Sequence, residues 1–255
     1  MKKALIISLL MLVIASPVIN AYTFKKYEGK KTYYCKDNGE KAYESFYYNI
    51  QFPTDGPNAL KKAILKNAFG YNGTSITAGI QKYTTDFLNT KIRHKLVSSN
   101  INYYAPNSLY GPLSDSSVYG EVKSQTSELI TYIVSSQRYY YSLKAIHYYI
   151  PENKVLKTSD LFLSSKTSAI NKLIQSKTHI ELRLSDCMYF IFENNGILLG
   201  FYTEEGGRIN PFTEITIPKY QLDGCLTALG EKLIKGEGKT KTKSRNKPSV
   251  VNSYE

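Results

Sequence analysis

The segment FENNGILLGFYTEEGGRINPFTEITIPKYQL, residues 192–222, decides the fold that we predict for this chain. Its first half carries the tripeptide Asn194-Asn195-Gly196 between two apolar and aromatic runs, 188–193 and 197–203. Asn and Gly accept the backbone angles of a tight turn, and such a turn between two β-forming runs is typical of a hairpin. The sequence therefore predicts an antiparallel hairpin at this point.

The second half of the segment predicts how the chain continues after the hairpin. Residues 204–211 are polar and rich in Gly, so we expect a loop, and residues 212–217 follow as another strand. Pro218 ends that strand and can serve as the first residue of a last helix. The apolar face of this helix is predicted from residues that recur at helical spacing: Leu222, Cys225, Leu226, Leu229 and Leu233.

Upstream, β-forming runs alternate with helical patterns. Helices are predicted between Pro57 and Gly70, over 80–97 and over 164–177, where apolar residues recur at helical spacing. Strands are predicted at 24–36, 45–52, 101–104, 118–124, 128–136, 139–150 and 154–157. This order predicts an α+β protein in which antiparallel sheets are packed by a few helices and the chain ends as strand, hairpin, strand and helix.

The N-terminus has the build of a secretory signal peptide. Lys2 and Lys3 precede an apolar run over residues 4–15, and Ala21 is a small residue suited to a signal peptidase. The run holds about a dozen residues, whereas a bilayer span needs roughly 20. We therefore expect cleavage after Ala21, export to the periplasm or the cell exterior, and no transmembrane segment in the mature chain. A permanent N-terminal anchor is the alternative.

The formal net charge is +12, and much of it lies outside the predicted fold. Residues 235–255 are rich in Lys, Ser and Gly without apolar periodicity, which predicts a disordered basic tail. The tail either keeps the protein soluble or attracts it to anionic envelope polymers or an acidic partner. Nucleic acid is not expected as a partner, because the chain is predicted to be exported and carries no recognised binding motif.

The chain has three cysteines, Cys35, Cys187 and Cys225, and this number limits the disulfides that it can form. In an oxidising compartment this number allows one disulfide and one leftover thiol, with three alternative pairings. Cys225 also fits as a small apolar residue on the last predicted helix.

The order of motifs in the last hundred residues resembles the extracellular domain of RsiV-type lysozyme-sensing anti-sigma factors, a domain also found in peptidoglycan deacetylases. The family's strand that ends in a "dlF" element is matched by residues 155–162, within the segment NKVLKTSDLF. Its hairpin, loop and strand are matched by residues 193–222, and its companion N-terminal strand by FYYNIQFPT, residues 46–54. The resemblance implies the same fold and a partner such as lysozyme.

This chain departs from the family pattern in two places. The family's Gly-Gly-Ala-His turn is replaced by residues 139–144, which contain no Gly pair, so His147 does not take the family's His role. In the loop after the hairpin, the family pattern is replaced by residues Glu204 to Arg208. The organisation that we predict is a signal peptide (1–21), an N-terminal α+β segment (22–140), a C-terminal RsiV-like domain (141–234) and the basic tail (235–255).

No sequence pattern points to catalysis. His94, His147 and His179 are scattered, and the chain has no HxxxH, HExxH or CxxC motif and no phosphate-binding Gly-rich loop after a strand. We therefore expect a protein that is not an enzyme, with no catalytic residues, no metal site and no cofactor.

Two sets of residues are candidates for binding. Tyr offers a large contact area at a low cost in side-chain entropy, and the loop after the hairpin carries charges. The candidates are Tyr139, Tyr140, Tyr141, Tyr148, Glu204, Glu205 and Arg208. The alternative for the tyrosines is an ordinary place in the core or on an edge strand.

The sequence therefore predicts an exported, non-catalytic binding module whose partner is lysozyme, peptidoglycan or an anionic envelope polymer. The positive charge of the chain opposes binding to basic lysozyme and favours an anionic polymer. The alternatives are an accessory domain or a hydrolase or deacetylase acting on envelope polysaccharide, and a structural envelope protein.

Overall fold

The computed structural model describes residues 22–37, 40–97, 116–137, 141–178, 180–193, 195–205 and 208–236, and in parts of these ranges only the backbone. The chain forms two compact units, Met1–Val155 and Leu156–Glu255. Both contain helices and strands, so the α+β prediction is confirmed.

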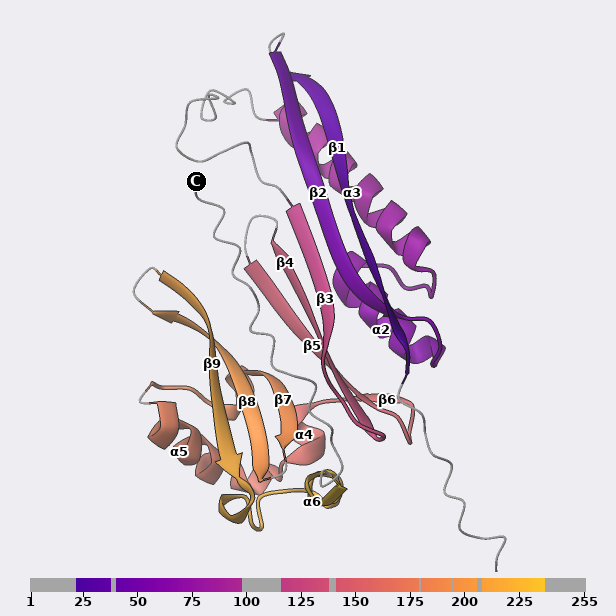
Figure 1. The fold of residues 1–255 in the computed structure, drawn as a ribbon. Helices are drawn as coiled ribbons and strands as arrows, with labels where there is room; N and C mark the ends of the chain where they lie inside the picture. The colour runs from indigo at the N-terminus through magenta and orange to yellow at the C-terminus, as the bar shows by residue number, and fades with distance from the viewer. Residues whose placement is uncertain are drawn as a thin grey trace, which may run out of the picture. The chain divides into compact units, whose positions relative to one another are not determined.

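The first unit is built on a six-stranded sheet in the order β1-β2-β3-β4-β5-β6 (Figure 1). Its strands are β1 (Phe24–Asp37), β2 (Glu40–Pro53), β3 (Ser116–Gln125), β4 (Leu129–Gln137), β5 (Tyr141–Tyr149) and β6 (Lys154–Leu156). Strand β2 pairs with β1 antiparallel and with β3 parallel, so the sheet is mixed. The parallel pair differs from the antiparallel arrangement expected, because two helices and a long connection separate β2 from β3.

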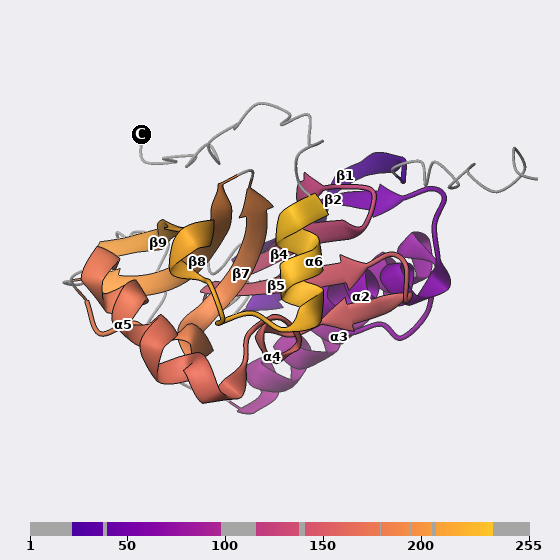
Figure 2. The same cartoon turned by 90° about the horizontal axis from the view of Figure 1, so that it is seen from below.

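Helices α2 (Asn58–Phe69) and α3 (Ile76–Val97) cover one face of this sheet (Figure 2). Alternate residues of β2, Phe46, Ile50 and Phe52, are buried on that face. They meet apolar residues of both helices, including Leu60, Ile64, Ile76 and Ile80. Period-two alternation in the strand and helical spacing in α2 thus build one shared core.

The ends of α2 agree with the turn signals in the sequence. Pro57 is the N-cap residue, and Gly70 ends the helix with φ 64° while its N–H donates to the Lys66 carbonyl. Such left-handed angles favour Gly. Helix α3 begins at Ile76, a turn earlier than predicted, and the Ser75 hydroxyl accepts a hydrogen bond from the Ala78 N–H at 3.3 Å.

The second unit begins with helix α4 (Thr158–Leu161), the 3₁₀ turn η2 (Ser164–Lys166), helix α5 (Thr167–Thr178) and the 3₁₀ turn η3 (Leu184–Asp186). An antiparallel sheet follows, β7 (Cys187–Glu193), β8 (Gly196–Glu205) and β9 (Arg208–Pro218), with β8 in the centre. Helix α5 contacts β9, and the last helix α6 (Ala228–Gly236) contacts β7 and α4.

The predicted loop over 204–211 is wrong, because residues 204–205 extend strand β8 and residues 208–211 begin strand β9. Glu204 pairs with Ile209 and Glu205 with Arg208. Pro211 is tolerated inside β9 because β9 is an edge strand of the three-stranded sheet.

The single last helix that was predicted from Pro218 is also wrong. The chain forms a 3₁₀ turn, η4 (Lys219–Gln221), and α6 starts only at Ala228. Gly224 has φ 65° and interrupts the helical path. Leu222, Cys225, Leu226 and Leu233 are nevertheless buried, because Leu226 bridges to Phe162 and carries this segment against α4.

Several predictions fall outside the described residues: the signal peptide over 1–21, the strand over 101–104, Tyr139, Tyr140, His179 and the tail beyond Gly236. The compact units meet between Val155 and Leu156, beyond the boundary predicted at 140/141. Strand β5 pairs with β4 along its whole length and so belongs to the first unit. No helix among the described residues has the length and apolarity needed to cross a bilayer.

Candidate functional site

Of the tyrosines predicted to bind a partner, Tyr141 and Tyr148 lie on β5, whereas Tyr139 and Tyr140 lie outside the described residues. Tyr141 is the first residue of β5. Tyr148 is completely buried, and its hydroxyl donates to Oδ1 of Asn153. Burial raises the pKa of Tyr148 to about 12. The Tyr148 ring is therefore part of the core and presents no surface to a partner.

The three charged candidates lie in the second unit, at the end of the β8–β9 hairpin. Glu205 and Arg208 are direct cross-strand partners, and Glu204 is the preceding residue on β8. The fold therefore brings these three positions together on one hairpin, which belongs to a different unit from the tyrosines of β5.

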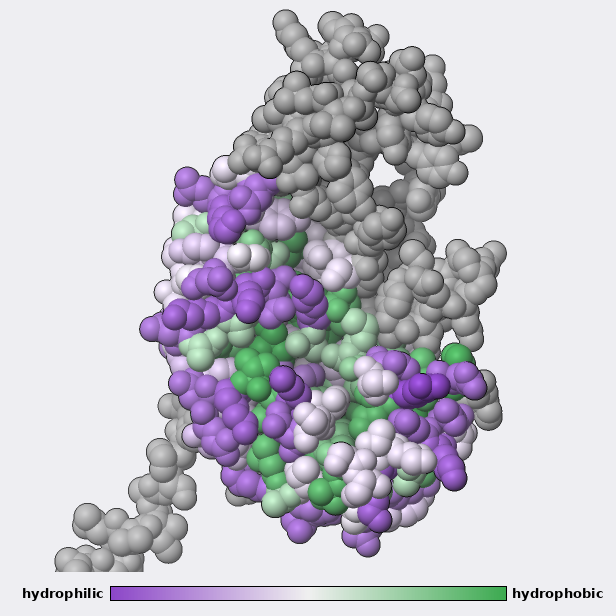
Figure 3. Space-filling view, turned by 180° about the vertical axis from the view of Figure 1, so that it is seen from behind, coloured by the Kyte–Doolittle hydropathy of each residue, from purple (hydrophilic) through white to green (hydrophobic). Residues whose placement is uncertain are grey.

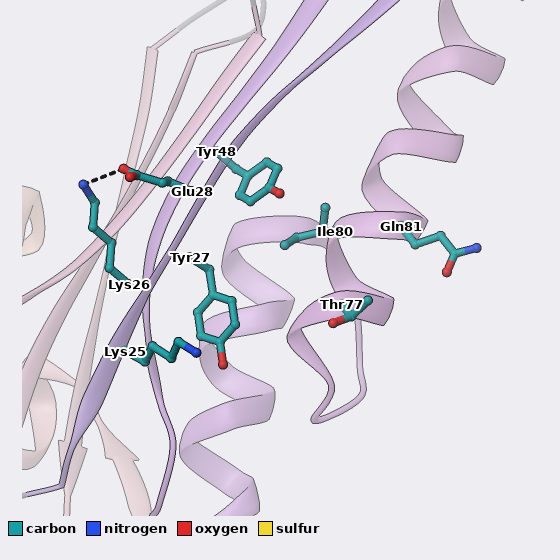
Figure 4. Close-up of a pocket in the computed structure, with 8 residues that line it drawn as sticks. All are labelled: Lys25, Lys26, Tyr27, Glu28, Tyr48, Thr77, Ile80 and Gln81. Carbon is teal, nitrogen blue, oxygen red and sulfur yellow. Dashed lines mark ion pairs between the residues drawn. The ribbon is translucent and has the colours of Figure 1, made fainter.

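A groove of about 570 Å³ lies in the first unit, where β1 and β2 face helix α3 (Figure 4). Lys25 and Tyr27 enter it from β1, Tyr48 from β2, and Thr77 and Ile80 from α3. Gln81 also lies beside the groove, but its side chain points away from the strands. None of these residues is among the binding candidates that the sequence predicts.

Strand alternation separates the charges of β1 between the two faces of the sheet. Lys26 and Glu28 lie on the face opposite Lys25 and Tyr27 and form an ion pair, with 2.5 Å between Nζ and Oε2. Glu28 is the only carboxylate among the eight residues around the groove, and it points away. The Lys25 ammonium therefore enters the groove, and the one carboxylate among these eight residues does not.

Gly29 sets the position of the Tyr48 ring. The two residues are cross-strand partners in the β1–β2 register. A Cβ atom at Gly29 would lie only 2.4 Å from the Tyr48 hydroxyl oxygen, so the ring lies across the glycine. The ring also stacks on Phe46, with 5.8 Å between centroids. Such an aromatic ring over a strand glycine is a recurrent way to cover exposed backbone.

Tyr27 and Lys25 extend the same wall along β1, two and four residues before Gly29. The Tyr27 ring packs edge-on against Phe52, with 6.3 Å between centroids. The Lys25 ammonium lies 5.6 Å from the centroid of the Tyr27 ring, within the range of a cation–π interaction. Together these residues offer aromatic faces, hydroxyl groups and one positive charge to a ligand.

Buried titratable groups elsewhere are held neutral. His147 lies on β5, with 3.3 Å between its Nδ1 and Oγ1 of Thr131, and burial lowers its pKa to about 3. Burial raises the pKa of the Cys187 thiol to about 12, which makes it a poor nucleophile. Cys187 and Cys225 are free thiols, and each of the three pairings that the sequence allows would need at least one of them.

The rest of the described surface gives weaker candidates. Large apolar side chains are exposed at scattered positions: Tyr119, Val155, Leu163 and Tyr220. Figure 3 shows hydrophilic and hydrophobic residues mixed on the face turned away from the viewer in Figure 1. Among the described residues, no group of three or more His, Cys, Asp and Glu is placed to hold a metal ion.

The groove could not be found from the sequence for a specific reason. Strand alternation indicates that Lys25 and Tyr27 lie on one face of a strand. Thr77 and Ile80, however, become their neighbours only when α3 packs on the sheet. The early start of α3 at Ile76, which places Thr77 in its first turn, was also missed.

Comparison with known proteins gives a fold but no activity. No family model matches the chain, and no curated protein matches it. A DUF3298 family protein from Bacteroides fragilis has a similar structure, with a TM-score of 0.64 and 13% sequence identity over 85% of this chain and 99% of that one. A DUF3298 family protein from Pseudomonas aeruginosa gives a TM-score of 0.55 and 13% identity over 83% of this chain and 97% of that one. This chain thus has the fold seen in structures of DUF3298 family proteins.

Proposed function

We propose that this chain is an exported, non-catalytic binding protein and that the groove between β1, β2 and α3 is a ligand site. The observation that carries the proposal is the composition of the groove. Lys25, Tyr27, Tyr48, Thr77 and Ile80 line it, and the Glu28 carboxylate points away and pairs with Lys26. Hydroxyl groups, aromatic faces and one cation suit recognition of a polar ligand.

The groove favours binding over catalysis because it lacks the arrangement that hydrolysis requires. General acid–base catalysis needs two groups positioned on either side of the reacting bond, commonly carboxylates or His. The side chains that enter the groove include neither. A hydrolase or deacetylase acting on envelope polysaccharide is the alternative, and it would need its acid and base at another place in the chain.

The envelope is the proposed place of action. The N-terminal segment has the build of a signal peptide, and the motif order resembles RsiV-type domains. These features support a partner such as lysozyme or a cell-wall component. The DUF3298 neighbours support the fold and carry no information on the partner.

Export is tested by expressing the full chain in a bacterial host and sequencing the N-terminus of the protein recovered outside the cytoplasm. We expect Tyr22 as the first residue. A chain that keeps residues 1–21 and sediments with membranes would show a permanent anchor instead.

Binding is tested by a pull-down of residues 22–255 against c-type lysozyme and against insoluble peptidoglycan. Two variants separate the two candidate sites: Tyr48→Ala in the groove, and Glu204→Lys with Glu205→Lys on the hairpin. Loss of saturable binding in the Tyr48 variant alone would support the groove. Loss in the hairpin variant alone would move the site to β8–β9, and the absence of binding to both partners would reject the proposal.

A further inference from the structure

We propose that the groove recognises a sugar unit that carries a carboxylate, and that Lys25 selects the charged form. This inference rests on the proposed function, because it names the ligand class of the same groove.

The walls of the groove match the two-sided chemistry of a sugar ring. A sugar presents C–H groups on its faces and hydroxyl groups at its edge. The rings of Tyr27 and Tyr48 and the side chain of Ile80 offer apolar contact, and the two phenols and the Thr77 hydroxyl can both donate and accept hydrogen bonds. The volume of about 570 Å³ lies within the range of small-ligand sites.

The charge distribution argues for an anionic rather than a neutral sugar. Among the described residues none forms an ion pair with Lys25, whereas the neighbouring Lys26 is paired with Glu28 on the other face. Thr77 belongs to the first turn of α3, a helix of 22 residues, so the positive end of the helix dipole adds to the Lys25 charge.

A carboxylate fits this charge better than a phosphate does. Phosphate sites usually gather several charged donors or a forked Arg contact. The groove supplies one ammonium beside an aromatic wall, which can be satisfied by a single carboxylate while the sugar ring lies on the tyrosines.

The test compares tetragalacturonate with its methyl ester, two ligands that differ in charge and share the sugar chain. Titration calorimetry on residues 22–255 measures both affinities. We expect the charged form to bind about fivefold more tightly, the size of a partly exposed ion pair. Lys25→Met is expected to remove the preference, and Lys26→Met to keep it.

Lys26→Met is the matched control because it makes the same charge change one residue away on the opposite face. Equal loss of the preference in both variants would show general attraction to a basic chain and would overturn the assignment to Lys25. Equal affinity for the acid and the ester would overturn the proposal that the groove recognises a carboxylate. In a folded Gly29→Ala variant the displaced Tyr48 ring should weaken binding of both ligands alike, and unchanged binding would also overturn the site.

Failure of this inference can be told apart from failure of the proposed function. If the protein binds peptidoglycan or lysozyme through the groove but neither oligosaccharide, the ligand class is wrong and the binding role stands. If it binds none of the four, both are rejected.

Discussion

The two sheets of this protein contain the same contact in two different settings. In the three-stranded sheet the Tyr189 ring lies over its cross-strand partner Gly200, and in the six-stranded sheet the Tyr48 ring lies over Gly29. Tyr189 is 2% exposed, and its hydroxyl donates to Glu214. Tyr48 is half-buried and forms a wall of the groove.

The difference shows that a Tyr–Gly pair does not by itself decide between core and surface. Burial and the hydrogen bond to Glu214 raise the pKa of Tyr189 well above its usual range and fix its ring. Tyr48 has space beside it, because α3 stands off from the strands at the groove. Three predictions test whether enclosure is what separates the two sheets.

The largest effect is expected from Gly200→Ala. The new methyl group would lie 2.3 Å from the Tyr189 ring, which has no free space to move into. Overpacking of this kind costs about 1–3 kcal/mol of the free energy of unfolding, and we expect the upper half of that range. Urea unfolding followed by circular dichroism measures the loss.

A double-mutant cycle identifies the cause of that loss. If the ring is the obstacle, Gly200→Ala should cost little or nothing in a Tyr189→Ala background. Equal costs in both backgrounds would show that Gly200 is needed for another reason, and the comparison between the two sheets would lose its basis.

An intermediate effect is expected from acid, through His147 in the enclosed part of the six-stranded sheet. The folded protein keeps His147 neutral down to about pH 3, whereas the unfolded chain takes up the proton near the usual pKa of 6.5. The contribution of His147 to the free energy of unfolding is therefore fully present above about pH 6.5. Below that pH it falls by about 1.4 kcal/mol per pH unit, which amounts to about 2 kcal/mol at pH 5.

Measurement of the free energy of unfolding at pH 7 and pH 5 tests this prediction. The variant His147→Gln should lose less stability than the wild type between these two values, because it has no proton to take up. The same loss in both proteins would contradict the buried, neutral His and would show that carboxylates elsewhere control the acid response.

The smallest effect on stability is expected from Gly29→Ala. Its Cβ would also lie 2.4 Å from Tyr48, but the contact is with the hydroxyl end of a ring that can turn into the groove. We expect a change below about 1 kcal/mol in the free energy of unfolding, measured in the same urea experiment. A loss as large as that of Gly200→Ala would show that the Tyr48 ring is enclosed as well.

Much of the architecture could be predicted because its signals are local. The hairpin turn between Glu193 and Gly196, the end of α2 at Gly70 and the strand over 45–52 depend on neighbours along the chain, and all three agree with the structure. The loop over 204–211 was predicted wrongly because pairing between β8 and β9 satisfies the backbone of a segment whose composition favours a loop.

The candidate site could not be predicted in the same way. Tyr148 looked like a binding residue because it lies in a Tyr-rich run, yet the structure places it in the core. Tyr27 and Tyr48 also belong to a segment that contains many Tyr residues, and only the position of α3 leaves their edges open to a groove.

The sequence by itself determined several local features of this protein: the strand over 45–52, the end of α2 at Gly70, the hairpin turn before Gly196, and the alternation that puts Lys25 and Lys26 on opposite faces of a strand. Only the tertiary structure decided which of those faces is closed, which tyrosines are buried, and that β2 runs parallel to β3. The physical reason is the distance along the chain between the residues that determine each feature. Turn angles and side-chain alternation depend on adjacent residues, whereas burial and the surroundings of a charge depend on residues far apart in the chain.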